Sequence, residues 1–329
     1  MSTPQIFSLS EIKAAKEKIA PYVQETPSVH WASPEKDRLF GDTEIWFKME
    51  LFQYGGSFKP RGALMVMLSL SEAALSRGVT AVSAGNHAIA VSYAANILGA
   101  SAKVVMPETS NPIRVQRCQA LGAEVILVKD VKIAFEETER LQREEGRTFV
   151  HPFEGPLTAL GTATVGYEVC HQTPRLDAFI IPVGGGGLAA GMASGIHALW
   201  PDCKIYGVEP EGADSMSRSF RSGQPESIES VKSIADSLGA PFALPYSFGL
   251  CRAHLEKIVL VDDIRLRSCM SLMFHELKLA VEPAGAASLA ALLGPLKEEL
   301  AGKKVGLIAC GSNIDWKKFR ELIDHAAPY

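Results

Sequence analysis

Short apolar stretches rich in β-branched and aromatic residues alternate along the chain with longer stretches of helical periodicity. The strand-like stretches are residues 44–49, 80–84, 102–106, 124–128, 178–183, 204–209 and 305–310. Helices are predicted to follow the first three of these stretches, from about Arg61, Asn86 and Pro112. The alternation predicts an α/β fold in which parallel sheets are covered by helices on both faces.

The bulk properties of the chain exclude several classes of function. Lys and Arg total 33 against 37 Asp and Glu, so a net charge of −4 offers no attraction to nucleic acid. No stretch approaches the 18 apolar residues of a membrane span, and the N-terminus lacks the apolar core of an export signal. We therefore expect a cytoplasmic protein with no membrane or nucleic-acid partner.

The cysteines and histidines give no sign of a disulfide framework or a transition-metal site. Six cysteines are scattered without a Cys-x-x-Cys pair, and the eight histidines form no His-Glu-x-x-His motif. Reduced, mostly buried thiols are expected.

Ligands of open α/β sheets bind beyond the carboxyl ends of the strands, so the strand-to-helix junctions are where chemistry is expected. Four junctions have unusual residues, namely 55–63, 83–87, 184–188 and 310–313. In the first, Lys59 stands just before Pro60, a residue favoured in the first turn of a helix. The lysine is either a catalytic group that points into the crevice or an ordinary solvated side chain.

The second junction, residues 83–87, leads from an apolar strand into an Ala-rich helix. Exposed N–H groups at the helix start, together with Ser83, Asn86 and His87, could bind a carboxylate. The alternative is that Ser83 or Asn86 only caps the helix. Local chemistry leaves both interpretations open.

The third junction places four consecutive glycines, Gly184 to Gly187, between a strand and a helix. Backbone N–H groups free of side chains can approach a phosphate, and a turn alone requires only one or two glycines. Gly184, Gly186 and Ala189 also match the dinucleotide fingerprint, with Glu209 as its ribose-binding acid. A nicotinamide-dependent oxidoreductase is therefore an alternative from a different class.

The fourth junction ends a buried strand at Cys310 and continues through Gly311, Ser312 and Asn313. A buried cysteine most often serves packing, and no neighbouring base marks it as a nucleophile. Its place at a strand end still makes it a candidate site residue.

Five segments together resemble the fold-type II pyridoxal-phosphate (PLP) enzymes, whose fold is like that of the tryptophan synthase β subunit. The segments are 56–63, 83–88, 184–188, 282–287 and 310–313, in the order in which the family has them. The resemblance covers nearly the whole chain and is strongest to the branch of threonine/serine dehydratases (ammonia-lyases) and serine racemases. It implies β-elimination of water and then ammonia from a β-hydroxy amino acid such as L-threonine or L-serine.

The resemblance implies a role for each matched residue. Lys59 would hold the cofactor as a Schiff base and act as the base at the substrate's α carbon. Phe58 would pack beside the cofactor ring, Asn86 would bind its 3-hydroxyl and Cys310 would face its nitrogen. The phosphate would lie on the backbone of the glycine turn, Gly184, Gly185, Gly186 and Gly187. The substrate carboxylate would lie on the loop Ser83, Ala84, Gly85, Asn86 and His87.

Two of these positions bear on the type of reaction. A thiol of ordinary pKa at Cys310 cannot keep the ring nitrogen protonated, which favours loss of a β leaving group over a long-lived carbanion. The family's racemases have a serine where this chain has Ala84, so we expect dehydration with little or no racemisation.

Departures from the family pattern occur at Gly55, at residues 161–164 and at Ser237. Gly55 removes side-chain volume, so a bulkier substrate such as phenylserine or 3-hydroxyaspartate is an alternative. The relatives' divalent-cation loop falls on Glu209, Ala213 and Ser215, but an aspartate is replaced by serine here, and ordinary surface acids are an equal interpretation.

The resemblance also implies two domains with the cofactor in the cleft between them. The large domain is expected to comprise residues 1–75 and 152–329, and the small domain, which closes on the substrate, residues 76–151. A homodimer or homotetramer without a regulatory domain is expected. A binding protein that has lost catalysis is a third class, against which the retention of Lys59 argues.

Overall fold

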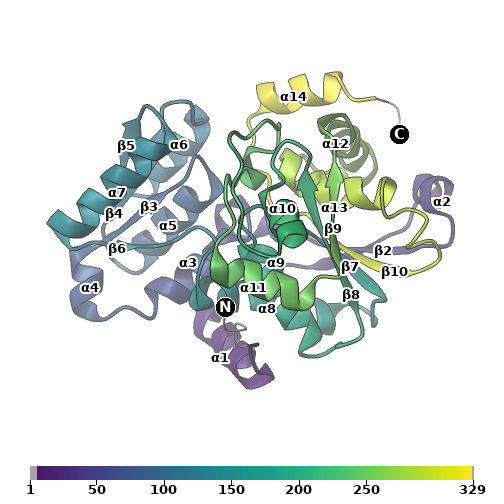
Figure 1. Cartoon of the computed structure of the whole chain (residues 1–329), viewed down its shortest axis with the longest axis horizontal. Helices are drawn as coiled ribbons and strands as arrows, with labels where there is room; N and C mark the ends of the chain where they lie inside the picture. Colours follow the sequence, from purple (N-terminus) through teal and green to yellow (C-terminus); the bar gives the residue numbers. More distant parts are fainter. Residues whose placement is uncertain (1–5, 328–329) are drawn as a thin grey trace.

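The computed structural model describes residues 6–327 and contains two sheets that lie side by side (Figure 1). The larger sheet has six strands in the order β1-β2-β10-β7-β8-β9. Its strands are β1 (Ser28–Trp31), β2 (Glu44–Lys48), β7 (Ala178–Pro182), β8 (Lys204–Pro210), β9 (Lys257–Val261) and β10 (Lys304–Ile308). Only the β1 and β2 pair is antiparallel; the other neighbours run parallel.

The smaller sheet is entirely parallel, with the order β5-β4-β3-β6. Its strands are β3 (Val79–Val82), β4 (Ala102–Pro107), β5 (Glu124–Val128) and β6 (Thr148–Phe149). The helices between them are α5 (Asn86–Ile97), α6 (Pro112–Ala120) and α7 (Val131–Glu145).

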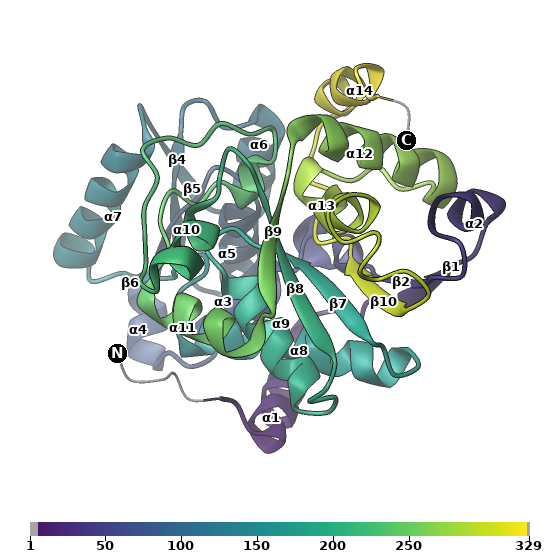
Figure 2. The ribbon, with the colours of Figure 1, turned by 45° about the vertical axis from the view of Figure 1, so that its right-hand side comes forward.

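The remaining helices precede the small sheet or belong to the large sheet. They are α1 (Leu9–Ile19), α2 (Pro34–Phe40), α3 (Lys59–Met67), α4 (Glu72–Arg77), α8 (Pro156–Gln172), α9 (Gly187–His197), α10 (Ser215–Ser222), α11 (Pro245–His254), α12 (Asp263–Leu277), α13 (Pro283–Leu293) and α14 (Trp316–Asp324). Short 3₁₀ turns are η1 (Ala20–Tyr22), η2 (Glu50–Phe52), η3 (Tyr54–Gly56) and η4 (Asp236–Leu238). Figure 2 shows α9 and α11 on one side of the large sheet and α12 and α13 on the other.

The central strands are buried over their whole length. All residues of β3 and β7 are buried, as parallel strands covered on both faces require. Among the described residues, no helix is long and apolar enough to cross a membrane. The predicted α/β class with parallel sheets is confirmed, whereas β1, β6 and β9 were not among the predicted strands.

The small sheet lies within the predicted range 76–151, but the core beneath it extends outside that range. Ala15 and Ile19 of α1 and Leu64 and Met67 of α3 are buried in the same apolar cluster as Val79 of β3. The helix that begins at Lys59 therefore packs against α5, which follows β3 of the small sheet, as well as against α8. Movement of one sheet relative to the other would therefore shift the position of Lys59.

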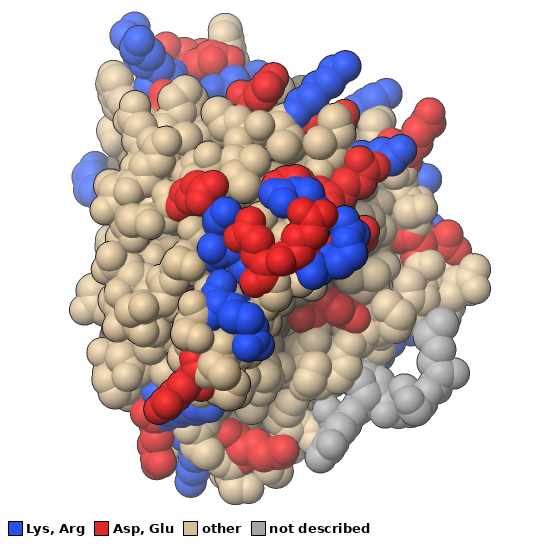
Figure 3. Space-filling model, turned by 90° about the vertical axis from the view of Figure 1, so that its left-hand side faces the viewer, with Lys and Arg blue, Asp and Glu red and all other residues tan. Residues whose placement is uncertain are grey.

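Charges of both signs alternate on the outer face of the small sheet (Figure 3). On α7, Arg140 lies 2.6 Å from Glu137 and 2.9 Å from Glu144, each about one helical turn away. Such pairs are typical of a solvated helix face.

Candidate active site

Lys59 begins α3, and its amine lies at the centre of the site. The Nζ atom donates a hydrogen bond of 2.6 Å to the carbonyl oxygen of Pro152. Burial lowers the pKa of Lys59 to about 8, although Cys310 and Glu282 oppose this shift. A buried amine with a lowered pKa is available as a nucleophile and as a base, which a solvated lysine is not.

A buried network fixes the helix on which this lysine stands. Arg61 donates to both carboxylate oxygens of Glu50 at 2.9 and 2.8 Å, and to both oxygens of Glu168 at 2.7 and 2.8 Å. Lys48 lies 2.6 Å from the same Glu168. Because the Arg61 side chain is fully buried, its two bidentate pairs hold the first turn of α3 against η2 and α8.

One cavity, here called the cofactor cavity, lies between the start of α3 and the glycine turn. Its lining includes Phe58, Lys59, Asn86, Gly184 to Gly187, Glu282 and Cys310. The sequence-predicted cofactor residues are thus brought together from four separate segments of the chain.

The glycine turn leaves no room for side chains. A Cβ atom on Gly185 would lie 2.2 Å from the ring of Phe153, and one on Gly187 would lie 2.6 Å from its carbonyl oxygen. Gly186 has a φ of 93°, in the left-handed region that favours glycine. No side chain caps α9, which starts at Gly187, so its first N–H groups are left for an anion. The turn therefore fits the phosphate of PLP.

Cys310 contributes a neutral thiol to this cavity. Its Sγ atom donates to the carbonyl oxygen of Ala284 at 3.4 Å. Burial raises the pKa of the thiol, and the carboxylate of Glu282 raises it further. The group is therefore protonated at neutral pH and cannot act as an anionic partner for a ring nitrogen.

The loop Ser83 to His87 connects β3 to α5 and has the form of an anion site. The Ser83 hydroxyl accepts the Gly85 N–H at 3.1 Å within the loop, and no side chain caps α5. The structure therefore does not support the alternative that Ser83 or Asn86 only caps the helix. A Cβ atom on Gly85 would lie 2.7 Å from the Arg114 guanidinium, which explains why glycine stands there.

Asn86 is held from three sides. Its Nδ2 donates to Glu282 at 2.6 Å and to the Ser237 hydroxyl at 3.3 Å, while its Oδ1 accepts from Asn313 at 2.6 Å. These bonds fix the amide at the wall of the cofactor cavity. Its contact with the cofactor 3-hydroxyl stays a prediction.

The two histidines near Lys59 are neutral. His87 donates from Nε2 to the carbonyl oxygen of Val150 at 2.7 Å, and burial lowers its pKa to about 3. Burial likewise lowers the pKa of His151 to about 4, and its Nδ1 accepts the N–H groups of Phe153 and Glu154. Both rings serve as uncharged structural groups.

A second cavity of about 190 Å³, here called the substrate cavity, adjoins the first. Its lining includes Lys59 and the loop Ser83 to His87. The apolar members of the lining are Val82, Pro107, Phe135, Phe153, Pro241 and Phe242, and its further polar members include Arg114, Asp236 and Ser237. The residues that line both cavities are Lys59, Asn86, Phe153, Gly185 and Ser237. Lys59 therefore stands where the two cavities adjoin.

The rim of the substrate cavity holds a paired arginine that sequence reasoning missed. Arg114 of α6 donates to Asp236 at 2.6 Å and to the carbonyl oxygen of Asn313 at 2.9 Å, and it lies 3.7 Å from Glu282. No motif marked Arg114, because its partners come from distant parts of the chain. The apolar wall residues were also missed, whereas Ser237 had been noted only as a departure from the family.

The predicted cation loop has the contacts of a capped helix. Glu209 accepts the N–H groups of Met216 and Ser217 at 3.0 and 2.7 Å, and Ser215 donates to the carbonyl oxygen of Ala240 at 3.0 Å. Burial raises the pKa of Glu209 to about 8. Over residues 6–327, no group of three His, Cys, Asp or Glu side chains is arranged to hold a metal ion. The cation at Glu209, Ala213 and Ser215 stays a prediction without support from these contacts.

The same contacts remove the support for a dinucleotide site. The carboxylate of Glu209 faces the start of α10, where a ribose could not reach it. The fingerprint of Gly184, Gly186 and Ala189 is thus part of the glycine turn beside Lys59.

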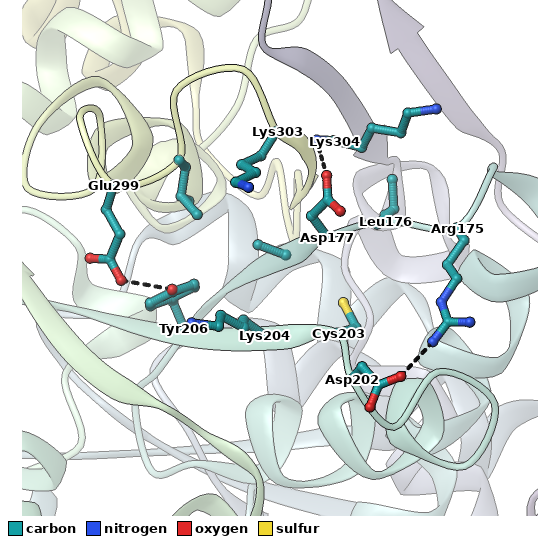
Figure 4. A pocket seen from close by; sticks show the side chains of 12 residues that line it. Arg175, Leu176, Asp177, Asp202, Cys203, Lys204, Tyr206, Glu299, Lys303 and Lys304 are labelled. Atoms are coloured by element: carbon teal, nitrogen blue, oxygen red, sulfur yellow. Dashed lines mark hydrogen bonds and ion pairs between the residues drawn. The ribbon is translucent and has the colours of Figure 1, made fainter.

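A larger cavity of about 450 Å³ lies at the opposite edge of the large sheet (Figure 4). Several of its charged groups already have partners within the protein. Arg175 lies 2.9 Å from Asp202, the Tyr206 hydroxyl donates to Glu299 at 2.8 Å, and Asp177 accepts the N–H of Lys304. Because it adjoins the amino ends of β7, β8 and β10, this cavity is at the edge where α/β sheets do not build active sites.

A buried lysine beside an anion-binding glycine turn and an adjoining substrate cavity defines an α/β enzyme with a phosphate-bearing carbonyl cofactor. The family model of pyridoxal-phosphate dependent enzymes matches residues 19–311, and the chain belongs to this family. The dinucleotide alternative is therefore wrong.

Known proteins similar to the chain over nearly its whole length include dehydratases and a racemase. It is 48% identical to a phenylserine dehydratase of Ralstonia pickettii, over 97% of both chains. It is 37% identical to an L-threo-3-hydroxyaspartate ammonia-lyase of Saccharomyces cerevisiae, over 95% of both. The structure of maize serine racemase superimposes with a TM-score of 0.90 at 33% identity, covering 98% of this chain and 100% of the other.

Proposed function

We propose that this protein removes water and then ammonia from a β-hydroxy amino acid with an uncharged β substituent, giving a 2-oxo acid. The observation that carries the proposal is the position of Lys59. Its amine, with a pKa lowered to about 8, lies where the cofactor cavity meets the substrate cavity. The 48% identical phenylserine dehydratase supports the same reaction type.

The residues of the cofactor cavity would hold PLP in a defined orientation. The backbone of Gly184 to Gly187 would bind its phosphate, and Phe58 and Asn86 would lie beside its ring. Bound there, PLP supplies an electron-withdrawing ring that accepts the charge left when the α proton of an amino acid is removed.

The residues of the substrate cavity would bind the amino acid and move its proton. The uncapped start of α5 and the loop Ser83 to His87 would receive the carboxylate. The Lys59 amine would take the proton from the α carbon. The neutral thiol of Cys310 adds no stabilisation to the resulting charge, so prompt departure of the β hydroxyl is favoured.

The charge of the rim argues for an uncharged β substituent. Arg114 is the cation on this rim, and it already pairs with Asp236 and lies near Glu282. A β carboxylate would therefore approach a guanidinium whose positive charge is already paired with carboxylates of the protein. Elimination from 3-hydroxyaspartate, the substrate in the name of the yeast relative, is accordingly disfavoured.

Racemisation is a second candidate reaction, because the maize structure is named a serine racemase. Racemisation requires an acid or base on the far face of the substrate carbanion. Ala84, at the position where the family's racemases have a serine, lines the substrate cavity with a methyl group. Elimination is thus proposed as the main reaction. A homodimer or homotetramer and a cytoplasmic location also remain proposals.

The purified protein allows a direct test. We expect visible absorbance from bound cofactor and, after borohydride reduction, a fixed cofactor mass on the Lys59 peptide. Release of 2-oxo acid is measured with threonine, serine, phenylserine and 3-hydroxyaspartate. Lys59→Ala should abolish turnover, whereas Lys257→Ala, at an exposed lysine paired with Glu299, should not. A colourless protein, or full turnover by Lys59→Ala, would contradict the proposal.

A further inference from the structure

Five aromatic rings form a closed circle of contacts beside the substrate cavity. Phe135 contacts Phe149 with ring centroids 6.4 Å apart, and Phe149 contacts His151 at 5.4 Å. The circle continues from His151 to Phe153 at 4.6 Å and from Phe153 to Phe242 at 6.2 Å. It closes from Phe242 back to Phe135 at 6.2 Å. Most of these rings meet tilted or edge-on, as aromatic clusters prefer.

The circle joins the two sheets. Phe135 stands on α7 and Phe149 on β6 of the small sheet, whereas Phe242 comes from the segment that precedes α11 of the large sheet. Phe242 is fixed there by a β-bridge with Ser227, and its neighbour Ala243 donates to the carbonyl oxygen of Glu226 at 2.9 Å.

Only three rings of the circle line the substrate cavity. Phe135, Phe153 and Phe242 do so, whereas Phe149 and His151 support them from outside the cavity. Phe135 and Phe242 are only half-buried, so each leaves part of a ring uncovered. Val82, Pro107 and Pro241 also line the cavity and add apolar surface to that of the rings.

We propose that Phe135 and Phe242 form a subsite for an aromatic β substituent, so that the preferred substrate is a 3-aryl-serine. This inference rests on the proposed elimination function and names its substrate class. The α carboxylate is fixed at the start of α5 and the α carbon at Lys59, so the β substituent is directed toward the remaining wall of the cavity. The remaining lining combines aromatic rings and prolines with Ser237 and with Arg114 and Asp236, whose charges are already paired with each other.

An aryl group gains more from this wall than a methyl group does. A ring can contact Phe135 and Phe242 at once, in tilted geometry like that in which these two rings already meet. The methyl group of threonine is too small to cover both rings. Phe153 contacts the glycine turn as well, where the Cβ position of Gly185 lies against its ring, so it is shared with the cofactor and does not select the substrate by itself.

The two-sheet origin of the subsite predicts how the aryl group acts. Because Phe135 and Phe242 belong to different sheets, a ring that binds both stabilises the closed arrangement of the sheets. Binding energy at the β substituent would then raise kcat as well as lower KM. Loss of either ring should affect both constants for an aryl substrate.

The test compares Phe135→Leu and Phe242→Leu with the wild type, using phenylserine and threonine as substrates. Leucine keeps most of the volume, and thermal unfolding confirms that each variant folds. We expect kcat/KM for phenylserine to fall by roughly tenfold in each variant, with threonine changed far less. Phe149→Leu is the matched control, because Phe149 belongs to the circle but does not line the cavity.

The outcomes separate the two proposals. If wild-type protein releases no 2-oxo acid from any β-hydroxy amino acid, the proposed function fails. If it dehydrates threonine but prefers it to phenylserine, the function stands and the aryl subsite is overturned. A fall in kcat/KM that is equal for phenylserine and threonine would assign the rings a structural role and would likewise overturn the subsite. The same holds if Phe149→Leu lowers kcat/KM for phenylserine as much as Phe135→Leu and Phe242→Leu do.

Discussion

Arg114 and Asp236 form an ion pair of 2.6 Å. Arg114 stands on helix α6, between β4 and β5 of the small sheet, and Asp236 stands on turn η4, between α10 and α11 beside the large sheet. The two residues are 122 positions apart in the chain. Their contact joins the parts of the chain around the two sheets at the rim of the substrate cavity. The pair therefore influences both the closure of the site and the charge that a substrate meets.

Replacement of Asp236 by asparagine should change the substrate preference. The variant keeps an oxygen that can accept a hydrogen bond but leaves the guanidinium of Arg114 without its nearest carboxylate. We expect kcat/KM for 3-hydroxyaspartate, relative to phenylserine, to rise by roughly tenfold, because a β carboxylate could then pair with Arg114. A ratio equal to that of the wild type would show that Arg114 does not face the β substituent.

The same variant should be almost as stable as the wild type. Asp236 is about half exposed, with 52% of its side chain accessible, and the buried Arg114 keeps Glu282 at 3.7 Å and the carbonyl oxygen of Asn313, so we expect a loss of about 1 kcal/mol. Asp202→Asn, which breaks the exposed pair with Arg175 in the remote cavity, is the matched control. It should leave both stability and substrate preference unchanged.

The cofactor side of the site and the loop Ser83 to His87 could be predicted from sequence, whereas the apolar part of the substrate cavity could not. Lys59, the glycine turn and Cys310 stand at strand ends, and parallel topology brings strand ends to one edge of a sheet. Phe135 carries no such signal, because an aromatic residue on an amphipathic helix has the same pattern whether it faces a core or a cavity. Its partner Phe242 is set by the path of a long loop, which local periodicity does not determine. Arg114 was missed for the same reason.

Arg61 should be essential for stability because it is a fully buried cation between two carboxylates. Arg61→Met would leave Glu50 and Glu168 in the interior with Lys48 as the nearby cation. We expect a loss of about 3–5 kcal/mol in the free energy of unfolding, measured by urea titration. Lys318→Met, which breaks an exposed pair with Glu321, should cost less than about 0.5 kcal/mol. Equal losses in both variants would contradict the role given to the buried network.

The buried pair His254 and His197 should make stability depend on pH. His197 donates from Nε2 to the carbonyl oxygen of Cys203, so its Nδ1 accepts from His254 Nδ1 at 2.9 Å. Among the described residues, His254 Nε2 has no partner. Burial, together with His197, lowers the pKa of His254 from 6.5 to about 4.

Because the pKa of His254 is lower in the folded protein than in the unfolded chain, the unfolded chain binds the proton more readily, and the free energy of unfolding falls as the pH falls. The stability is complete above the unfolded pKa of 6.5 and is lost as the pH falls toward the folded pKa of about 4. His254→Asn should therefore reduce the slope of unfolding free energy against pH in this window by up to about 1 kcal/mol per pH unit. Urea titrations at pH 7, 6 and 5 measure this slope. Identical slopes for variant and wild type would show that His254 takes up no proton on unfolding.

Ala84 should decide whether the protein racemises its substrate. If Ala84 stands where the serine of the family's racemases returns a proton to the far face of the α carbon, the wild type has only a methyl group for that task. We expect serine to give 2-oxo acid without detectable D-serine.

Ala84→Ser adds a hydroxyl to the lining of the substrate cavity, and it should produce measurable D-serine while elimination continues. Ala84→Gly changes the same position without a hydroxyl and is the control. Chiral analysis of the remaining serine gives the answer. D-serine formed at similar rates by the wild type and Ala84→Ser would mean that the second proton comes from another residue, for which Ser237 is a candidate because it lines both cavities.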